Sequence, residues 1–142
     1  MRVMVMTKGT GADEGKGEPS QEMFEAMQTY NEQLVKAGII LAGEGLKPSS
    51  AGAQVVFAAG GTSVVDGPFT ESKEIIAGYW IWEVSSLAEA VEWAKRCPFD
   101  ARYGATQTLE IRPLYGMEDF AEVVDSETLA KAQDLHERGG EA

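Results

Sequence analysis

The segment from residue 75 to residue 84 most constrains the fold, because it is apolar on both of its alternating faces. Its β-branched and aromatic composition is typical of a long strand. Side chains two residues apart on a strand share a face. One face holds Ile75, Tyr79 and Ile81, and the other holds Ile76, Trp80 and Trp82. Such a strand needs apolar cover on both sides of its sheet.

Five further segments are expected to be extended, from apolar runs or from alternation. Residues 2–7 are apolar on both faces, like the long strand. Gly60 and Gly61 form a two-residue linker typical of a hairpin, so the segments on either side should pair. A short run that ends in Gly43-Glu44-Gly45 indicates a strand that breaks into a turn. The expected strands are residues 2–7, 39–42, 54–59, 62–65, 75–84 and 106–114.

Three segments have the apolar spacing of helices. Ser20 is a plausible N-cap for the first, and Gly38 supplies its left-handed end. Ser86 and Glu89 form a capping box for the second, which Pro98 stops. The expected helices are residues 20–37, 86–97 and 126–138, the last ended by Gly139-Gly140.

The order strand, helix, hairpin, long strand, helix, strand predicts an α+β, ferredoxin-like split βαβ sandwich with an added hairpin. In this topology the first and the long strand are central, and the last strand lies beside the first at an edge. Helices cover only one face of such a sheet, yet both central strands are apolar on both faces. Burial of apolar area is worth ~25 cal/mol per Å2, so the uncovered face favours association. We therefore expect a homodimer in which sheet faces sheet.

Composition argues against several classes of function. A net charge of -11 and a pI near 4.5 oppose binding to nucleic acids and to anionic membranes. No run approaches the ~18 apolar residues of a membrane span, and no signal-peptide pattern is present, so a cytoplasmic protein is expected. Cys97 is the single cysteine, which argues against an intrachain disulfide. We expect no cofactor and no metal, because residues 11–16 fail the phosphate-loop pattern and the lone His136 lacks partner ligands.

Four motifs occur in order along the chain. They are Gly43-Glu44-Gly45-Leu46, the block DGPFTESKE from Asp66 to Glu74, Gly78-Tyr79, and Glu110-Ile111-Arg112-Pro113-Leu114. On these motifs the chain closely resembles the DGPF branch of the YCII-related family, over about residues 1–115. The resemblance implies a dimeric α+β barrel, and genes of this branch often lie beside those of extracytoplasmic-function sigma factors. Biochemical activity is mostly unassigned in the family.

We expect residues 116–142 to form an acidic C-terminal helical extension of the same domain. They hold eight acidic residues against Lys131 and Arg138, and 2 minus 8 gives a net charge of -6. The family at large has been proposed to use a His and Asp pair in its cleft, and this sequence departs from that pattern. Its only histidine, His136, lies outside every matched motif. Acid-base chemistry would have to rest on carboxylates, Lys or Tyr.

The DGPF block has two interpretations. In the structural one, Asp66 bonds turn amides and Phe69 anchors the bend in the core. In the functional one, the bend presents charged side chains at the mouth of a cleft, beside a glycine-flanked carboxylate and a tyrosine hydroxyl. The candidate ligand-binding residues are Glu44, Asp66, Glu71, Lys73 and Tyr79.

Two functions remain open from the sequence. The first is a protein that binds a small molecule in a cleft, with or without lyase- or isomerase-like chemistry from a carboxylate base. The polar cluster at the loop ends favours it. The second is a non-catalytic accessory or regulatory protein in an extracytoplasmic-function sigma factor system. The lack of a histidine in the motifs and the acidic tail favour the second.

Overall fold

The computed structural model describes residues 1–9, 20–69, 75–99 and 107–140. Within these ranges the chain forms three α-helices, an antiparallel four-stranded sheet and a separate hairpin, so the expected α+β class is confirmed. Two short 3-10 helices, η2 (Ser49–Ala51) and η4 (Met117–Phe120), join the larger elements. The larger elements are β1 (Arg2–Gly9), α1 (Gln21–Lys36), β2 (Ile40–Gly45), β3 (Ala53–Ala58), β4 (Gly61–Asp66), β5 (Ile75–Glu83), α2 (Leu87–Ala94), β6 (Thr108–Pro113) and α3 (Ser126–Gly140).

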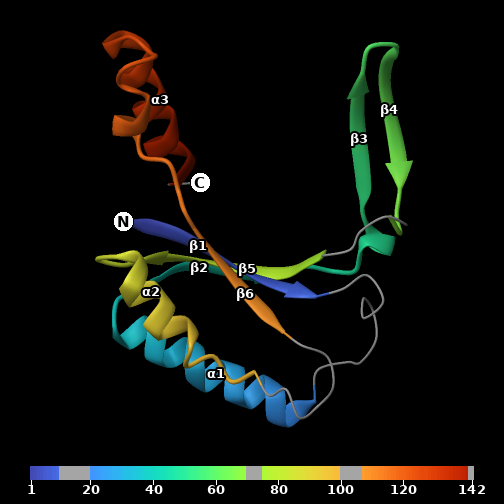
Figure 1. Cartoon of the computed structure of the whole chain (residues 1–142), viewed down its shortest axis with the longest axis vertical. Helices are drawn as coiled ribbons and strands as arrows, with labels where there is room; N and C mark the ends of the chain where they lie inside the picture. The colour runs from blue at the N-terminus through green and yellow to red at the C-terminus, as the bar shows by residue number, and fades with distance from the viewer. Residues whose placement is uncertain (10–19, 70–74, 100–106, 141–142) are drawn as a thin grey trace.

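The main sheet has the strand order β2-β5-β1-β6, with all neighbours antiparallel. The two strands expected to be central, β1 and β5, are central, and β6 lies beside β1 at an edge as expected. In the register of the central pair, Val3 faces Trp82 and Val5 faces Trp80. Helices α1 and α2 lie on one side of this sheet, whereas α3 and the β3–β4 hairpin extend from the other side (Figure 1).

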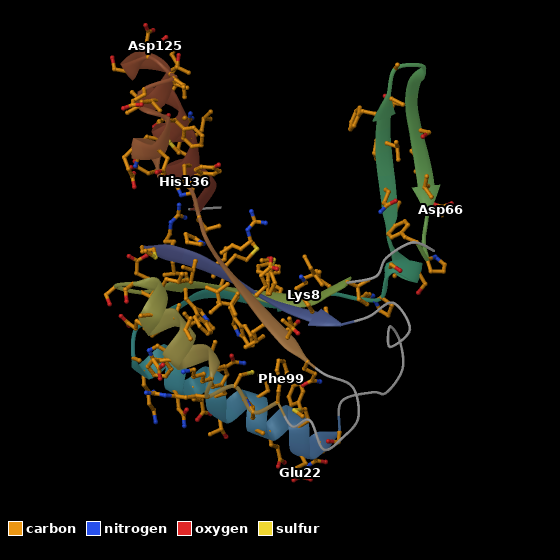
Figure 2. All side chains as sticks on the ribbon, viewed as in Figure 1. Lys8, Glu22, Asp66, Phe99, Asp125 and His136 are labelled. Carbon is orange, nitrogen blue, oxygen red and sulfur yellow. The ribbon has the colours of Figure 1, made fainter. Side chains whose placement is uncertain are left out.

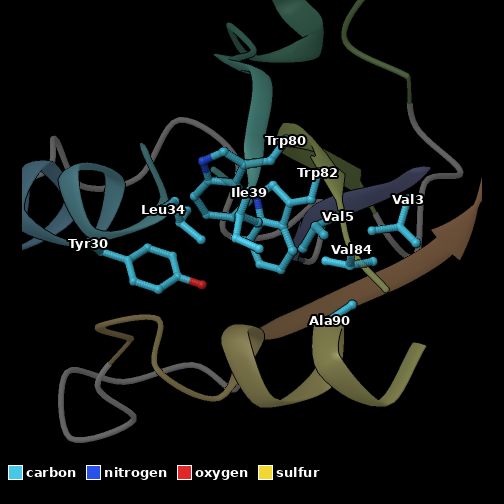
Figure 3. Close-up of a cluster of buried hydrophobic side chains, with 9 residues drawn as sticks. All are labelled: Val3, Val5, Tyr30, Leu34, Ile39, Trp80, Trp82, Val84 and Ala90. Atoms are coloured by element: carbon cyan, nitrogen blue, oxygen red, sulfur yellow. The ribbon is translucent and has the colours of Figure 1, made fainter. Parts of the chain in front are cut away.

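The core fills the layer between the sheet and the two helices (Figure 3). Val3, Val5, Leu34 and Trp82 are completely buried there. The Tyr30 hydroxyl donates to the carbonyl oxygen of Trp93 at 2.7 Å and so ties α1 to α2. The second face of the sheet has no such helical layer among the described elements. Within one chain, therefore, only one of the two apolar faces of β1 and β5 is covered by the described helices.

The ends of α1 follow the sequence expectation. The Ser20 hydroxyl accepts a hydrogen bond from the backbone N–H of Met23 at 3.1 Å, which satisfies one of the free donors of the first turn. Gly38 follows the helix with φ of 71°, a conformation that costs little only for glycine. These local signals fix where the helix begins and ends.

The other helices differ in detail from the expectation. Ser86 caps α2, but the Glu89 carboxylate accepts from the Ser85 N–H rather than from the cap residue itself. Helix α2 ends at Ala94, before Pro98, with hydrogen bonds that close its last turn. Helix α3 continues through Gly140, so the two glycines do not stop it.

The β3–β4 hairpin forms a sheet of its own. Its strands pair from Ala53 with Asp66 to Ala58 with Gly61, so the expected hairpin is confirmed, but its two turn residues are Ala59 and Gly60, one position before the expected linker. Every residue of both strands is exposed. In Figure 1 the hairpin stands away from the main sheet, while α3 extends from the opposite end of the same side. The sheet face that the helices leave uncovered, called the open face below, lies between these two projections.

Candidate functional site

The candidate site is built on the open face, and strand register defines it. Met6 on β1 faces Tyr79 on β5 and Glu110 on β6, and Tyr79 in turn faces Glu44 on β2. Four side chains therefore form one row across all four strands. Opposite residues in antiparallel strands have Cβ atoms ~5 Å apart, so each member of the row is the cross-strand neighbour of the next. Two predicted site residues, Glu44 and Tyr79, are brought side by side.

A second row lies one step along the strands. Met4 faces Ile81 and Arg112, and Ile81 faces Ala42. The centre of the open face is therefore apolar in both rows, and its polar groups lie on the edge strands. A floor of apolar side chains with a few polar groups at its margins is the usual composition of a ligand site.

An ion pair closes the β6 side of the first row. The Lys8 Nζ lies 3.1 Å from the Glu110 Oε1, and the two side chains are only 18% and 39% exposed. Figure 2 shows Lys8 on β1, on the sheet and away from the hairpin that carries Asp66. Partial burial weakens screening by water, so this pair is electrostatically stronger than an exposed one. It holds the ammonium and the carboxylate beside Met6.

Glycines on β2 and β5 let the strands adopt this arrangement. Sequence reasoning placed Glu44 in a turn, but β2 continues through Gly45, and residues 42–45 pair with β5 without interruption. A Cβ at position 43 would lie 2.7 Å from the Trp80 Cδ1, so the indole fills the space that a side chain would need. A Cβ at position 78 would lie 3.0 Å from the Glu44 carbonyl oxygen. These motif glycines serve strand packing, which places the Glu44 and Tyr79 side chains.

The bend that follows β4 is structural in its geometry. A Cβ at Gly67 would overlap the carbonyl oxygen of Ser49, and the Gly67 N–H donates to the Gly52 carbonyl oxygen at 3.1 Å. The bend is thus packed against η2 at the foot of the hairpin. Phe69 is half-buried but belongs neither to the core cluster nor to the residues packed against it, so its expected role as a core anchor is wrong.

Asp66 is not part of the row. It ends β4, is exposed and pairs with Ala53 of the hairpin rather than with any strand of the main sheet. Its carboxylate forms no hydrogen bond or ion pair to a described residue. The two remaining candidates, Glu71 and Lys73, and the loop at residues 11–16 lie outside the described residues.

Three residues of the open face were missed as site residues by sequence reasoning: Lys8, Glu110 and Arg112. The alternation of residues 106–114 does place Glu110 and Arg112 on one face of a strand. Only the register of β6 against β1 shows that this face continues the row of Glu44 and Tyr79. The signal for Lys8 is weaker still, because a lysine at a strand end is common on solvated edges.

Outside the open face, the reactive residue types that the structure describes do not form a second centre. Burial raises the pKa of Cys97 to about 12, so its thiol stays protonated at neutral pH and is a poor nucleophile. His136 is exposed on α3. Within the described ranges no group of three or more His, Cys, Asp or Glu side chains is arranged to hold a metal ion. A shallow depression on α1, lined by Gln28, Asn31, Glu32, Val35 and Lys36, belongs to the helical layer.

The comparisons with known proteins concern the part of the chain that forms the main sheet. The model of the YCII-related domain matches residues 1–115, which include all four strands of the main sheet and both helices packed on it. The chain is a member of the YCII-related family. An uncharacterised protein of Rhizobium meliloti (strain 1021) is similar to this YCII-related chain. The two are 31% identical over 97 residues, which is 68% of this chain and 77% of that protein.

The family match bears on the choice of site residues. The part of this YCII-related chain that matches its family contains the whole row across the sheet, whereas His136 lies beyond it. Helix α3 also lies beyond the matched residues. No helix in the described ranges of this YCII-related protein combines the length and the apolar character that crossing a membrane requires.

Proposed function

We propose that this YCII-related protein binds a small molecule on the open face of its sheet, and that a second copy covers this face to form a dimeric α+β barrel. The observation that carries the proposal is the row of Glu44, Tyr79, Met6 and Glu110 across the sheet. It combines hydrogen-bonding groups with an apolar floor on a face that no described helix covers.

The charges of the site suggest the class of ligand. Two carboxylates, those of Glu44 and Glu110, flank the row, and among the described residues only that of Glu110 is paired with a cation, Lys8. The chain as a whole carries a net charge of -11, which lowers the local concentration of anions. A neutral or cationic molecule with amino or hydroxyl donors and an apolar body fits these properties best. A carboxylate base acting on such a molecule is the chemistry of lyases and isomerases.

The covering copy follows from the apolar centre of the open face. Met6 is buried within one chain, but Met4, Tyr79 and Ile81 stay half-buried. A contiguous apolar face of this kind on a soluble protein marks an interaction site. A two-fold axis in the plane between two such sheets would bring identical apolar centres together and leave the polar edge strands at the rim.

A screen of neutral and cationic metabolites by thermal shift tests the ligand site. We expect Tyr79→Phe and Glu44→Gln each to weaken the binding of a hit about 10-fold, because each removes one hydrogen bond or charge contact. Asp66→Asn is the matched control, since it also removes an exposed carboxylate but lies off the row. Calorimetric titration of the hit provides the affinities.

The Asp66→Asn control also provides the result that would contradict a ligand site on the open face. A hit whose affinity is lost in Asp66→Asn and kept in both row variants would move the site from the open face to the foot of the hairpin. Because Asp66 has no hydrogen bond to a described residue, its substitution should leave the melting temperature nearly unchanged in either case.

A second candidate function is that of an accessory protein that binds a protein partner. The feature that favours it is α3, which projects from the domain and exposes most of its charged residues. Its acids are partly neutralised within the helix, as in the 2.8 Å pair of Arg138 and Asp134. A screen without a single hit on folded protein, together with capture of a partner that requires α3, would favour this function.

A further inference from the structure

The β3–β4 hairpin exposes large apolar side chains on both of its faces. Val55, Phe57 and Val64 lie on one face of it and are 54%, 82% and 67% exposed. Its other face carries Val56 and Val65, which are also exposed. A two-stranded hairpin is at best marginally stable in water by itself, and apolar side chains exposed on both of its faces are unfavourable in water. This element has the composition of one that is covered in the working protein.

We propose that the hairpin of each copy packs against the second copy and clasps the dimer formed by the open faces. This inference rests on the dimer of the proposed function and adds a second, separate contact to it. The hairpin rises from the same side of the sheet as the open face, as Figure 1 shows. A copy placed on that face would therefore lie beside the hairpin.

The area of the open face argues that a second contact is needed. Four strands at ~4.8 Å spacing and six residues of ~3.3 Å each span only about 400 Å2. A stable interface buries about 800 Å2 on each partner. One face of the hairpin adds about 200 Å2 to each copy by the same geometry. Each copy also buries about 200 Å2 where the hairpin of the other copy packs against it. When both hairpins make this contact, the area buried on each partner reaches the value typical of a stable interface.

The length of the hairpin indicates where it would lie. Six residues extend it by about 20 Å, whereas two stacked sheets are about 10 Å apart. The hairpin therefore reaches past the partner's sheet and lies along its edge instead of ending on the open face. Its foot is fixed by the contact of Gly67 with Ser49 and by the hydrogen bond from Gly67 to Gly52. An arm held at its base in this way loses little entropy when it binds.

Substitution of Phe57 tests this inference, with Phe24 as the matched control. Phe57→Asp should raise the dissociation constant of the dimer about 10-fold or more, because the most exposed apolar side chain of the hairpin loses its contact. Phe24 is 58% exposed on α1, on the side of the sheet away from the open face, so Phe24→Asp should leave the constant unchanged. Sedimentation velocity over a dilution series measures both.

Hydrogen exchange of the unmodified protein gives a second measurement that needs no variant. Backbone amides of residues 53–66 should exchange more slowly at protein concentrations above the dissociation constant of the dimer than at concentrations below it. If the protein dimerises but Phe57→Asp and this exchange show no effect, the clasp is overturned while the sheet-to-sheet dimer stands. If the unmodified protein is monomeric, the dimer and the clasp are both overturned. A hairpin that binds lipid vesicles or another protein without affecting the dimer would also overturn the clasp.

Discussion

Replacing Ile81 by glutamate should convert the protein into a folded monomer. Ile81 lies in the second row of the open face, between Met4 and Ala42, and away from the core between sheet and helices. In the dimer the new carboxylate would be buried without a partner at the centre of the interface. Burying this charge should weaken the free energy of dimer formation by roughly 3 kcal/mol, which raises the dissociation constant about 100-fold. Size-exclusion chromatography with light scattering should report the mass of one chain.

The matched control for this prediction is Leu87→Glu. Leu87 is also a partly exposed aliphatic residue, but it begins α2 in the layer opposite the open face. A carboxylate at a helix N-terminus is favourable, so the fold should be unaffected. Circular dichroism should show both variants folded. An Ile81→Glu protein that stays as dimeric as the Leu87→Glu protein would show that the open face is not the interface.

Replacing Trp82 by alanine should cost about 3–5 kcal/mol of folding free energy, because it removes a fully buried indole from the centre of the core. That is a large part of the ~5–15 kcal/mol that holds a domain together. The Trp82 indole lies beside that of Trp80, with ring centroids 5.8 Å apart, and both pack under α1 and α2. Urea unfolding followed by circular dichroism measures the loss.

Trp82→Phe separates packing from hydrogen bonding at the same position. The Nε1–H of Trp82 has no acceptor among the described residues, so replacing the indole breaks no hydrogen bond seen in the structure. Phenylalanine should therefore restore at least half of the stability that alanine loses. If it restores none, the indole N–H makes a contact beyond the described residues and the packing explanation is incomplete.

Much of the fold could be predicted from the sequence because the signals are local. The Ser20 cap and the Gly38 stop fix α1 through contacts within a few residues. The two glycines at 60 and 61 predicted the hairpin in the same way, although its turn lies one residue earlier, at Ala59 and Gly60. The central position of β1 and β5 followed from the order of the elements, because that order predicts the ferredoxin-like topology in which these two strands are central.

The candidate site could be predicted only in part, because it depends on contacts between distant segments. Glu44 and Tyr79 were chosen for their motifs, and β2–β5 pairing brings them together. Lys8 and Glu110 are 102 positions apart in the chain, and no local pattern shows that they pair. The motif glycine Gly43 was read as part of a turn, since glycine clusters usually are, whereas its role is to accommodate the indole of Trp80.

Sedimentation equilibrium of the unmodified protein shows whether a second copy covers the open face, and both the proposed ligand site and the clasp depend on that copy. At micromolar concentration we expect a single species of twice the 15.3 kDa mass of one chain. A species of 15.3 kDa that persists at tens of micromolar would show that the protein is a monomer. The open face would then be a surface that the protein leaves uncovered, or offers to a different molecule.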